Sequence, residues 1–213
     1  MFTGIIRQTG KVVSIKQTGD GKRLTISAPP EMLSKLEKGI TSIAIDGACH
    51  TAEEFDKSGF TVYSSFETLR RTTIGALRQG SVVNLELPLT PQSLMDGHIV
   101  QGHVDGIGKI VSAEQKGESR LYTFSLPKEL AFYLVEKDSA AIDGISLTVF
   151  DIRDNIFSAA VIPETIANTG LPYKSPGDSV NIEVNILSKY AAKMGGKSPA
   201  GDKERKLKDW LKQ

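Results

Sequence analysis

The chain lacks the features that mark membrane, secreted and nucleic-acid-binding proteins. No apolar run approaches the roughly 18 residues that a membrane-spanning helix needs. Residues 1–6 have neither the cationic start nor the long apolar stretch of a signal peptide. The single cysteine, Cys49, excludes an intrachain disulfide, and a net charge of +1 gives no case for a nucleic-acid surface. These absences predict a cytoplasmic protein with no membrane or nucleic-acid partner.

The sequence does contain an internal repeat at a constant spacing of 97 residues. The Ile-Asp-Gly of residues 45–47 returns at 142–144, and the Val-Asn-Leu-Glu of 83–86 returns as Val-Asn-Ile-Glu at 180–183. Other matched pairs are Thr51 and Thr148, Glu67 and Glu164, Thr68 and Thr165, Thr72 and Thr169, and Pro30 and Pro127. Chance does not hold one spacing across so many polar positions. We therefore predict two homologous domains, 1–95 and 96–187, followed by a helical tail, 188–213.

Each copy consists mainly of short strand-like segments. Val83, Leu85 and Leu87 alternate with polar residues, and residues 180–186 repeat this alternation in the second copy. A period of two predicts one apolar face on a core and one polar face directed outward or into a pocket. Further strands are expected at 12–15, 24–26 and 60–63, and short helices near 29–33 and 127–130, each with a proline at its start. Many short strands favour a closed or nearly closed β-barrel, because closure removes exposed strand edges.

The tail has a different pattern, typical of an amphipathic helix. Its apolar stripe consists of Leu187, Tyr190, Ala191 and Met194, continued after a Gly- and Pro-containing break by Leu207, Trp210 and Leu211. Such a stripe is buried either against the protein's own barrel or against another subunit. The sequence leaves both interpretations open.

Two hydroxyl-bearing residues follow the second Asp-Gly turn. Strand alternation from Asp143 places Ser146 and Thr148 on one face, where they can hold a polar heterocycle by directional hydrogen bonds. The same pattern also fits an ordinary strand with solvent-facing hydroxyls. Cys49 occupies the equivalent stretch of the first copy, where a lone cysteine is either a small buried hydrophobe or a functional thiol.

The junction between the copies, residues 96–106, holds two of the three histidines. A metal site would recruit His98 and His103 together with Cys49 and His50. However, a five-residue spacing on an extended strand directs the two junction histidines to opposite faces, and no pair of Cys or His residues completes a site. We therefore expect no metal.

Taken together, these segments resemble the riboflavin synthase family of the β-barrel, homotrimeric type. The matching segments are 1–5, 97–105, 142–149, 162–165 and 180–184, and the likeness runs in order from residue 1 to about residue 194. The resemblance implies an all-β fold of two homologous six-stranded Greek-key β-barrels in tandem with a C-terminal α-helix. In this family, that helix makes the contact between the subunits of a homotrimer.

The resemblance also implies a reaction. Two molecules of 6,7-dimethyl-8-ribityllumazine exchange a four-carbon unit and give riboflavin and 5-amino-6-ribitylamino-pyrimidinedione, the last step of riboflavin biosynthesis. The family needs neither a metal nor an added cofactor. Each barrel is expected to hold one lumazine, and the active site to form where the N-terminal barrel of one subunit meets the C-terminal barrel of another. Association with lumazine synthase is a further partner that the resemblance allows.

Candidate site residues follow from the resemblance, position by position. It assigns four residues to the N-barrel site, Ser42, Cys49, Thr51 and Thr68. It assigns five to the C-barrel side, His103, Asp143, Ser146, Thr148 and Thr165, with Lys137 nearby. The implied catalytic roles are ring positioning by Ser146 and Thr148, proton movement by His103, and attack by Cys49 or by a water that it orients. The other six residues are expected to bind substrate.

Three positions depart from the family's usual pattern, and two other functions compete with the enzyme. The family usually has Asn in place of Asp46, Leu in place of His50 and often Asp in place of Asn185. We interpret His50 as a surface residue. The main alternative function is a non-catalytic lumazine- or flavin-binding protein on the same fold, and another is a ligand-storage or interaction module. The presence of Cys49, His103 and the hydroxyl pair favours the enzyme.

Overall fold

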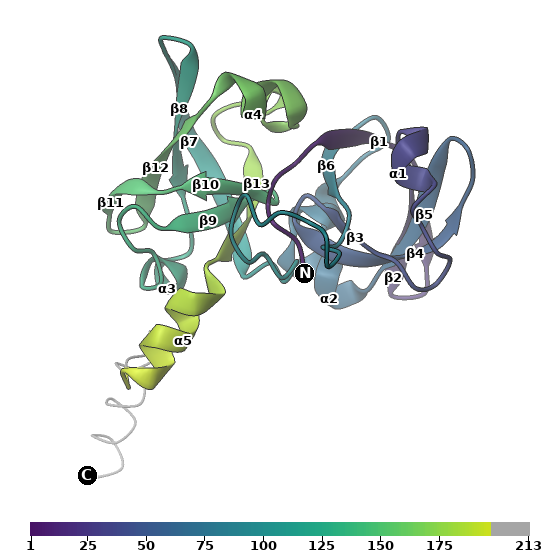
Figure 1. Ribbon diagram of the computed structural model, residues 1–213, viewed down its shortest axis with the longest axis horizontal. Helices are drawn as coiled ribbons and strands as arrows, with labels where there is room; N and C mark the ends of the chain where they lie inside the picture. Colours follow the sequence, from purple (N-terminus) through teal and green to yellow (C-terminus); the bar gives the residue numbers. More distant parts are fainter. Residues whose placement is uncertain (197–213) are drawn as a thin grey trace.

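The computed structural model describes residues 1–196 and consists of two β-lobes with one helix projecting from the second lobe (Figure 1). The lobes correspond to the two sequence copies, the first coloured purple to blue and the second teal to green. The N-terminal segment runs between them. No helix in residues 1–196 is long and apolar enough to cross a membrane. The predicted continuation of the tail through Leu207, Trp210 and Leu211 lies outside the described residues.

The first lobe is a closed barrel of six antiparallel strands in the order β1-β2-β5-β4-β3-β6. The strands are β1 (Gln8–Thr18), β2 (Gly21–Ser27), β3 (Ser42–Ile45), β4 (Ala48–Phe55), β5 (Gly59–Ser64) and β6 (Val82–Glu86). Between them lie α1 (Pro30–Leu33), α2 (Phe66–Arg71) and the 3₁₀ helix η1 (Thr73–Ala76). The predicted strands at 12–15, 24–26 and 60–63 are confirmed, as is the proline-led helix at Pro30.

The second lobe repeats this topology with one strand divided. Its sheet has the order β10-β9-β13-β7-β8-β12-β11. The strands are β7 (Gly106–Lys116), β8 (Ser119–Ser125), β9 (Ser139–Ile142), β10 (Ile145–Thr148), β11 (Phe150–Arg153), β12 (Ile156–Val161) and β13 (Ser179–Val184). Helices α3 (Lys128–Ala131), α4 (Pro163–Asn168) and η2 (Leu171–Tyr173) accompany them.

The two ends of this second sheet are adjacent in sequence. Only Val149 separates β10 from β11, and together these two strands correspond to β4 of the first barrel. The chain itself therefore links the edges of the curled sheet. The prediction of an all-β fold with two homologous barrels is confirmed, and the division of one strand was not predicted.

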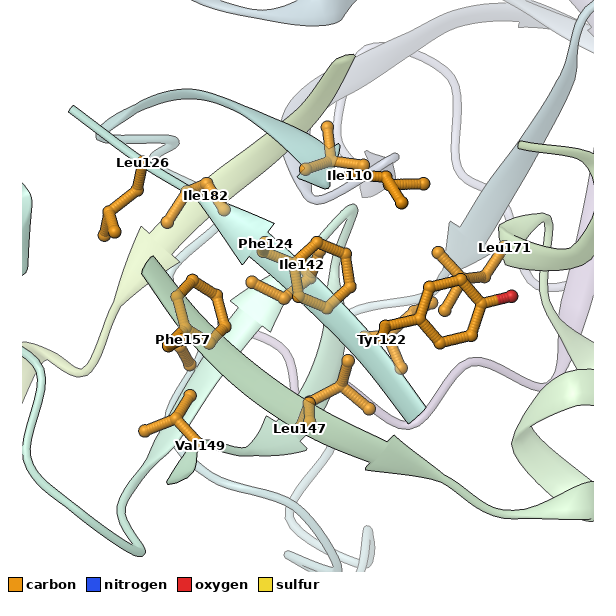
Figure 2. Close-up of a cluster of buried hydrophobic side chains, with 14 of the residues drawn as sticks. Ile110, Tyr122, Phe124, Leu126, Ile142, Leu147, Val149, Phe157, Leu171 and Ile182 are labelled. Carbon is orange, nitrogen blue, oxygen red and sulfur yellow. The ribbon is translucent and has the colours of Figure 1, made fainter. Parts of the chain in front are cut away.

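Each lobe has its own apolar core. In the second lobe, three aromatic side chains stack in succession, Tyr122 on Phe124 at 5.8 Å and Phe124 on Phe157 at 5.4 Å between ring centroids (Figure 2). Offset aromatic pairs of this kind combine a large buried apolar area with a favourable ring geometry. A third, small cluster lies between the lobes and consists of Phe2, Ala44, Val100 and Ala141.

The polar faces of β6 and β13 are buried between the halves of the molecule. Asn84 and Asn181 are 2% and 1% exposed, although the alternating pattern predicted a face directed outward or into a pocket. Period-two alternation identifies the two faces of a strand but not what covers the polar one. Here the other barrel covers it, and these strands form the contact between the lobes.

Helix α5 (Ile186–Met194) begins directly after β13 and extends away from the second barrel (Figure 1). The period-two segment predicted to reach residue 186 thus ends at Val184. The side chain of Asn185 caps the helix, accepting a hydrogen bond from Leu187 N at 3.0 Å. Leu187, Tyr190 and Met194 are 61%, 59% and 87% exposed, so the apolar stripe does not pack on its own barrel.

Candidate functional site

The two Asp-Gly turns of the repeat meet at the contact between the barrels. Asp46 and Gly47 have φ angles of 44° and 77°, and Asp143 and Gly144 have 47° and 79°. Two successive residues with positive φ are typical of the tight turns that join twisted antiparallel strands. A Cβ on Gly47 would lie 2.7 Å from Gly144 N, and a Cβ on Gly144 would lie 2.8 Å from Gly47 N. Only glycine fits at both positions.

A reciprocal pair of asparagines joins the barrels around these turns. Asn84 Nδ2 donates to Asp143 O at 2.9 Å, and Asn84 Oδ1 accepts from Gly170 N at 2.6 Å. In the second copy, Asn181 Nδ2 donates to Asp46 O at 2.8 Å, and its Oδ1 accepts from Thr73 N at 2.7 Å. Each side chain thus satisfies two backbone groups of the opposite barrel. The repeat is therefore also a spatial symmetry, because every bond in one direction has its counterpart in the other.

One half-buried cation, Lys174, lies near both turn carboxyls and contacts that of Asp143. Asp46 accepts a hydrogen bond from Asn84 N at 2.8 Å, while Asp143 accepts one from Asn181 N at 2.7 Å and another from Lys174 Nζ at 2.5 Å. The position equivalent to Lys174 in the first copy is Leu77. Burial and the nearby charge of Asp143 raise the pKa of Asp46 to about 7. Burial opposes the charge of Lys174, but the two carboxyls outweigh it and raise the pKa of that lysine.

Two leader segments, residues 1–5 and 98–103, enter their barrels through buried glutamates. Thr3 N and Gly4 N donate to the Glu86 carboxyl at 2.7 and 3.1 Å. Gly102 N and His103 N donate to the Glu183 carboxyl at 3.0 and 2.9 Å. Burial raises the pKa of both glutamates. The glutamates that the repeat places at the ends of β6 and β13 therefore anchor the two leaders.

Each leader then pairs with the opposite barrel. Ser146 N donates to Gly4 O at 2.8 Å, and Cys49 N donates to Gly102 O at 2.8 Å. Between these points the leaders pair with each other, where Phe2 forms an isolated β-bridge with Val100. Each barrel edge that carries a candidate catalytic residue is consequently completed by the leader of the other copy.

A cavity of about 330 Å³ opens at the Ser146 edge of the second barrel. Its walls come from the N-terminal leader and the residues just before β1, from β10 and from α4. The lining residues are Gly4, Ile5, Ile6, Arg7, Ile145, Ser146, Glu164, Thr165, Asn168 and Thr169. Its size and its mixture of apolar walls with a few hydroxyl and amide groups suit a small polar ring system.

A histidine that the sequence analysis did not select contacts Ser146. His98 Nδ1 and Ser146 Oγ are hydrogen-bonded at 2.7 Å. Burial lowers the pKa of His98, with the charge of Asp138 partly opposing this effect, so the ring is neutral near pH 7. Among residues 1–196, no hydrogen-bond partner reaches its buried Nε2 atom. The available signal was the first of the two histidines in the junction, but spacing alone could not bring it to Ser146.

The N-barrel residues gather on the matching edge of the first barrel. Ser42 pairs with Thr51 and Ala44 with Cys49 across β3 and β4, which places Ser42, Thr51 and Cys49 on one face. Cys49 is half-buried and Thr51 is exposed. Thr68 stands on α2, whose first turn is capped by Ser65 through a bond from Thr68 N at 3.2 Å. By the repeat, Cys49, Thr51 and Thr68 match Ser146, Thr148 and Thr165 of the second barrel.

Four predicted C-barrel residues are absent from the lining of the C-barrel cavity. Thr148, the last residue of β10, is exposed. His103 was expected on the C-barrel side, but it follows Gly102 in the leader that pairs with Cys49, so it stands at the N-barrel edge. Asp143 is 1% exposed and bonded to Lys174 beneath the turn, so it does not line the cavity. Lys137 is exposed, and its backbone N donates to Val149 O at 2.8 Å, one residue beyond Thr148.

His50 is buried, which corrects its interpretation as a surface residue. It is 5% exposed and points into the first barrel, on the face of β4 opposite Cys49. Its Nδ1 donates to Ala48 O at 2.8 Å and its Nε2 accepts from the Ser64 hydroxyl at 2.8 Å. Burial lowers the pKa of His50, so the ring is neutral in the core. Within residues 1–196, no group of three or more His, Cys, Asp or Glu residues is placed to hold a metal ion.

Two other hollows lie away from the candidate residues. One of about 470 Å³ lies among α1, the N-terminal segment and residues 85–96. The other, of about 570 Å³, lies beside Asp46 and Lys174 at the contact between the barrels. Neither is lined by any of the ten predicted site residues, whereas the C-barrel cavity contains Ser146 and Thr165.

The fold and the site define a class: tandem β-barrel proteins with equivalent polar edges on the two barrels and a small cavity at the edge of the second. The family model for the lumazine binding domain matches the chain twice, at residues 3–88 and 101–185. Riboflavin synthase of Actinobacillus pleuropneumoniae is 40% identical, with 100% of this chain and 99% of that protein covered. Riboflavin synthase of Bacillus subtilis is 38% identical, with 89% and 87% covered. The chain therefore belongs to the riboflavin synthase family of duplicated lumazine-binding domains.

Solved structures show the same fold at lower sequence identity. The crystal structure of LumP complexed with riboflavin superimposes with a TM-score of 0.81 at 24% identity, covering 86% of this chain and 99% of that one. The LumP complex with 6,7-dimethyl-8-(1'-D-ribityl) lumazine gives a TM-score of 0.78 at 23% identity. Both superpositions include the two barrels, so they show that the fold is shared.

Proposed function

We propose that the protein is an enzyme that acts as a riboflavin synthase, a transferase that moves a four-carbon unit between two molecules of 6,7-dimethyl-8-ribityllumazine. The observation that carries this proposal is the reciprocal duplication, in which two copies of one fold present equivalent edges to two copies of one substrate. Similarity to riboflavin synthases over the whole chain supports it. The products are riboflavin and 5-amino-6-ribitylamino-pyrimidinedione, whose atoms together equal those of the two lumazines. The reaction therefore needs no second substrate.

The first contribution to rate is the fixed placement of the two reactants. A bimolecular encounter that is held in register can gain about 7–11 kcal/mol at best. The remaining work is proton transfer, because one lumazine must lose a methyl proton while the other accepts a nucleophile. We assign these tasks to polar groups at the barrel edges and to the neutral imidazole of His98.

At the C-barrel edge, we assign ring positioning to Ser146, which lines the cavity, and to Thr148 at the exposed end of β10, with Thr165 on α4 completing the polar wall. The hydrogen bond from His98 to Ser146 orients the serine hydroxyl toward the ligand and offers a neutral acceptor for a proton. Lys137 is assigned to the exposed rim, near the end of β10. Asp143 contributes to substrate binding indirectly, by holding the turn that precedes Ser146.

At the N-barrel edge, Ser42, Thr51 and Thr68 are assigned to the second lumazine. Cys49 is the candidate nucleophile, or the group that orients a water molecule acting as the nucleophile. His103 stands close in the leader that pairs with Cys49, and we assign it to proton movement between the two ligands. The two edges then differ in chemistry, with a thiol in one and a hydroxyl–imidazole pair in the other.

The complete active site is proposed to form between subunits of a homotrimer. The exposed stripe of Leu187, Tyr190 and Met194 on α5 supports this, because an apolar helix face left uncovered by its own barrel suits contact with other copies. The N-barrel edge of one subunit would then face the C-barrel edge of the next. A cytoplasmic location and association with lumazine synthase belong to the same proposal, and the single cysteine is compatible with a reducing compartment.

Incubating the purified chain with 6,7-dimethyl-8-ribityllumazine and following riboflavin absorbance tests the proposal. Wild-type protein should form riboflavin, and the Cys49→Ser and Ser146→Ala variants should form it more slowly, each by about 10- to 100-fold. An exposed control, Gln115→Ala, should match the wild type. Tight lumazine binding without any riboflavin would contradict the enzyme and favour a non-catalytic lumazine-binding protein on the same fold.

A further inference from the structure

The cores of the two barrels differ at one pair of equivalent positions. The first barrel has the hydrogen-bonded pair His50 and Ser64. The second barrel has Leu147 and Val161 at the equivalent positions, both within its apolar core. A histidine opposite a valine, or a serine opposite a leucine, would leave a buried polar atom without a partner. The polar pair of the first barrel therefore replaces the apolar pair of the second as a unit, and each polar residue requires the other.

This pair joins β4 to β5 where their backbone ladder ends. The paired residues of the two strands begin at Ala52 and Val62 and continue away from His50 and Ser64. Extending the register two residues further brings His50 opposite Ser64. The side-chain hydrogen bond thus continues the connection between the strands beyond the last backbone pair.

Two walls of the N-barrel site begin at this connection. Cys49 and Thr51 flank His50 on β4 and occupy the opposite face of that strand. On the other side, Ser64 ends β5 and the next residue caps α2, the helix that carries Thr68. The distance between the strand wall and the helix wall therefore depends on how His50 and Ser64 are held.

We infer that His50 is a positioning residue of the N-barrel site: through Ser64 it fixes the strand that carries Cys49 relative to the helix that carries Thr68. This inference rests on the proposed function, which places a lumazine or flavin at that edge. His50 itself points into the core and does not touch the ligand. Its neutral ring donates one hydrogen bond and accepts another, and so holds the two strands as the apolar contact does in the second barrel.

Cys49 provides a direct readout, because it is the only cysteine in the chain. The rate at which a thiol reagent labels Cys49 is measured in the full-length protein at increasing riboflavin concentrations. The variants are His50→Leu, Ser64→Ala and the double variant His50→Leu/Ser64→Val, which reproduces the apolar pair of the second barrel. Val12→Ala is the matched control, since it removes buried atoms of the same core from β1, which lies opposite β4 in the barrel.

The riboflavin concentration that halves the labelling rate should rise about tenfold in His50→Leu and in Ser64→Ala, because each leaves a buried polar atom unpaired. The double variant should return to within about twofold of wild type, and Val12→Ala should not change. Thermal unfolding is recorded in parallel to show that each variant folds. If His50→Leu does not fold, Ser64→Ala, the smaller change, tests the positioning role.

Three results would overturn the inference: protection of His50→Leu at the wild-type concentration, a double variant no better than the single ones, or an equal loss in Val12→Ala. Failure of riboflavin to protect wild-type Cys49 would overturn the N-barrel site and the inference together. The expected pattern in a protein that never forms riboflavin from lumazine would support the positioning role and reject the proposed reaction alone.

Discussion

The side-chain amide of Asn84, in the first barrel, donates to the backbone oxygen of Asp143, in the second barrel, at 2.9 Å. Its counterpart Asn181 returns the same bond to Asp46 at 2.8 Å. Both amides also accept a hydrogen bond from a backbone N–H group of the opposite barrel, at a contact from which solvent is almost absent. The two barrels are thus joined by obligatory hydrogen bonds and not by apolar contact alone.

Replacing Asn84 by alanine should weaken the whole fold. The change leaves Asp143 O and Gly170 N buried without their partner and should lower the free energy of unfolding by about 2–4 kcal/mol. Urea denaturation followed by circular dichroism measures this loss. Gln115→Ala, on an exposed hairpin, should change the value by less than about 0.5 kcal/mol. Equal effects of the two substitutions would argue against a structural role for the reciprocal pair.

Asp46 should make stability depend on pH. Its pKa is raised to about 7 in the folded chain from an ordinary 3.8, so the folded state binds more protons between these values and stability falls as pH rises through that window. Asp46→Asn removes the titration, keeps an acceptor for Asn84 N and tolerates the positive φ. The variant should therefore gain in melting temperature over wild type, more at pH 8 than at pH 5.

Asp143→Asn is the informative control for this prediction. It removes the carboxyl that binds Lys174 and leaves a buried cation with weaker compensation, so it should lower the melting temperature at pH 8. A melting-temperature difference between Asp46→Asn and wild type that stays constant from pH 5 to pH 8 would show that Asp46 does not titrate in this range.

His98 should matter for turnover more than for stability. Its bond to Ser146 orients the hydroxyl at the cavity, and His98→Ala should slow riboflavin formation by about 10- to 100-fold. Single-turnover measurements separate this step from product release. Asp96→Asn, an exposed substitution two residues earlier in the same segment, should leave the rate unchanged. Wild-type turnover in His98→Ala would remove this residue from the mechanism.

Charges on α5 should separate the subunits. Leu187→Glu combined with Tyr190→Glu places two carboxylates on the exposed stripe, which is expected at the subunit contact. Light scattering should show the mass falling from about three chains of 23.0 kDa to one. The barrels should remain folded, because both positions are exposed in the single chain, while riboflavin formation should fall with the loss of the shared site. An unchanged mass would place the subunit contact elsewhere.

Much of the fold follows from the repeat. Matching positions such as Asp46 and Asp143, held at one spacing, predict two like domains, and the period-two segments predict barrels. The division of one strand at Val149 was not predictable, since β10 and β11 read as one continuous segment. The apolar stripe of α5 was recognised, but only the structure shows that its own barrel leaves it uncovered.

The candidate site was harder to predict from the sequence than the fold, because it depends on the path of the two leader segments. Each leader is anchored by a glutamate about 80 residues away, Glu86 or Glu183, and then pairs with the opposite barrel. Local sequence patterns do not indicate that a leader crosses to the opposite barrel. For this reason His103 was expected beside Ser146, whereas His98 occupies that place. His50 was taken as exposed because its partner, Ser64, lies on the neighbouring strand.

The most direct test of the account is the mass balance of the reaction. Purified protein is incubated with 6,7-dimethyl-8-ribityllumazine alone, in the presence of a metal chelator, and substrate and products are quantified by chromatography. The account predicts two lumazines consumed for each riboflavin formed, with one pyrimidinedione released beside it. Lumazine that is bound but recovered unchanged, or riboflavin formed only when a metal or second substrate is added, would contradict it.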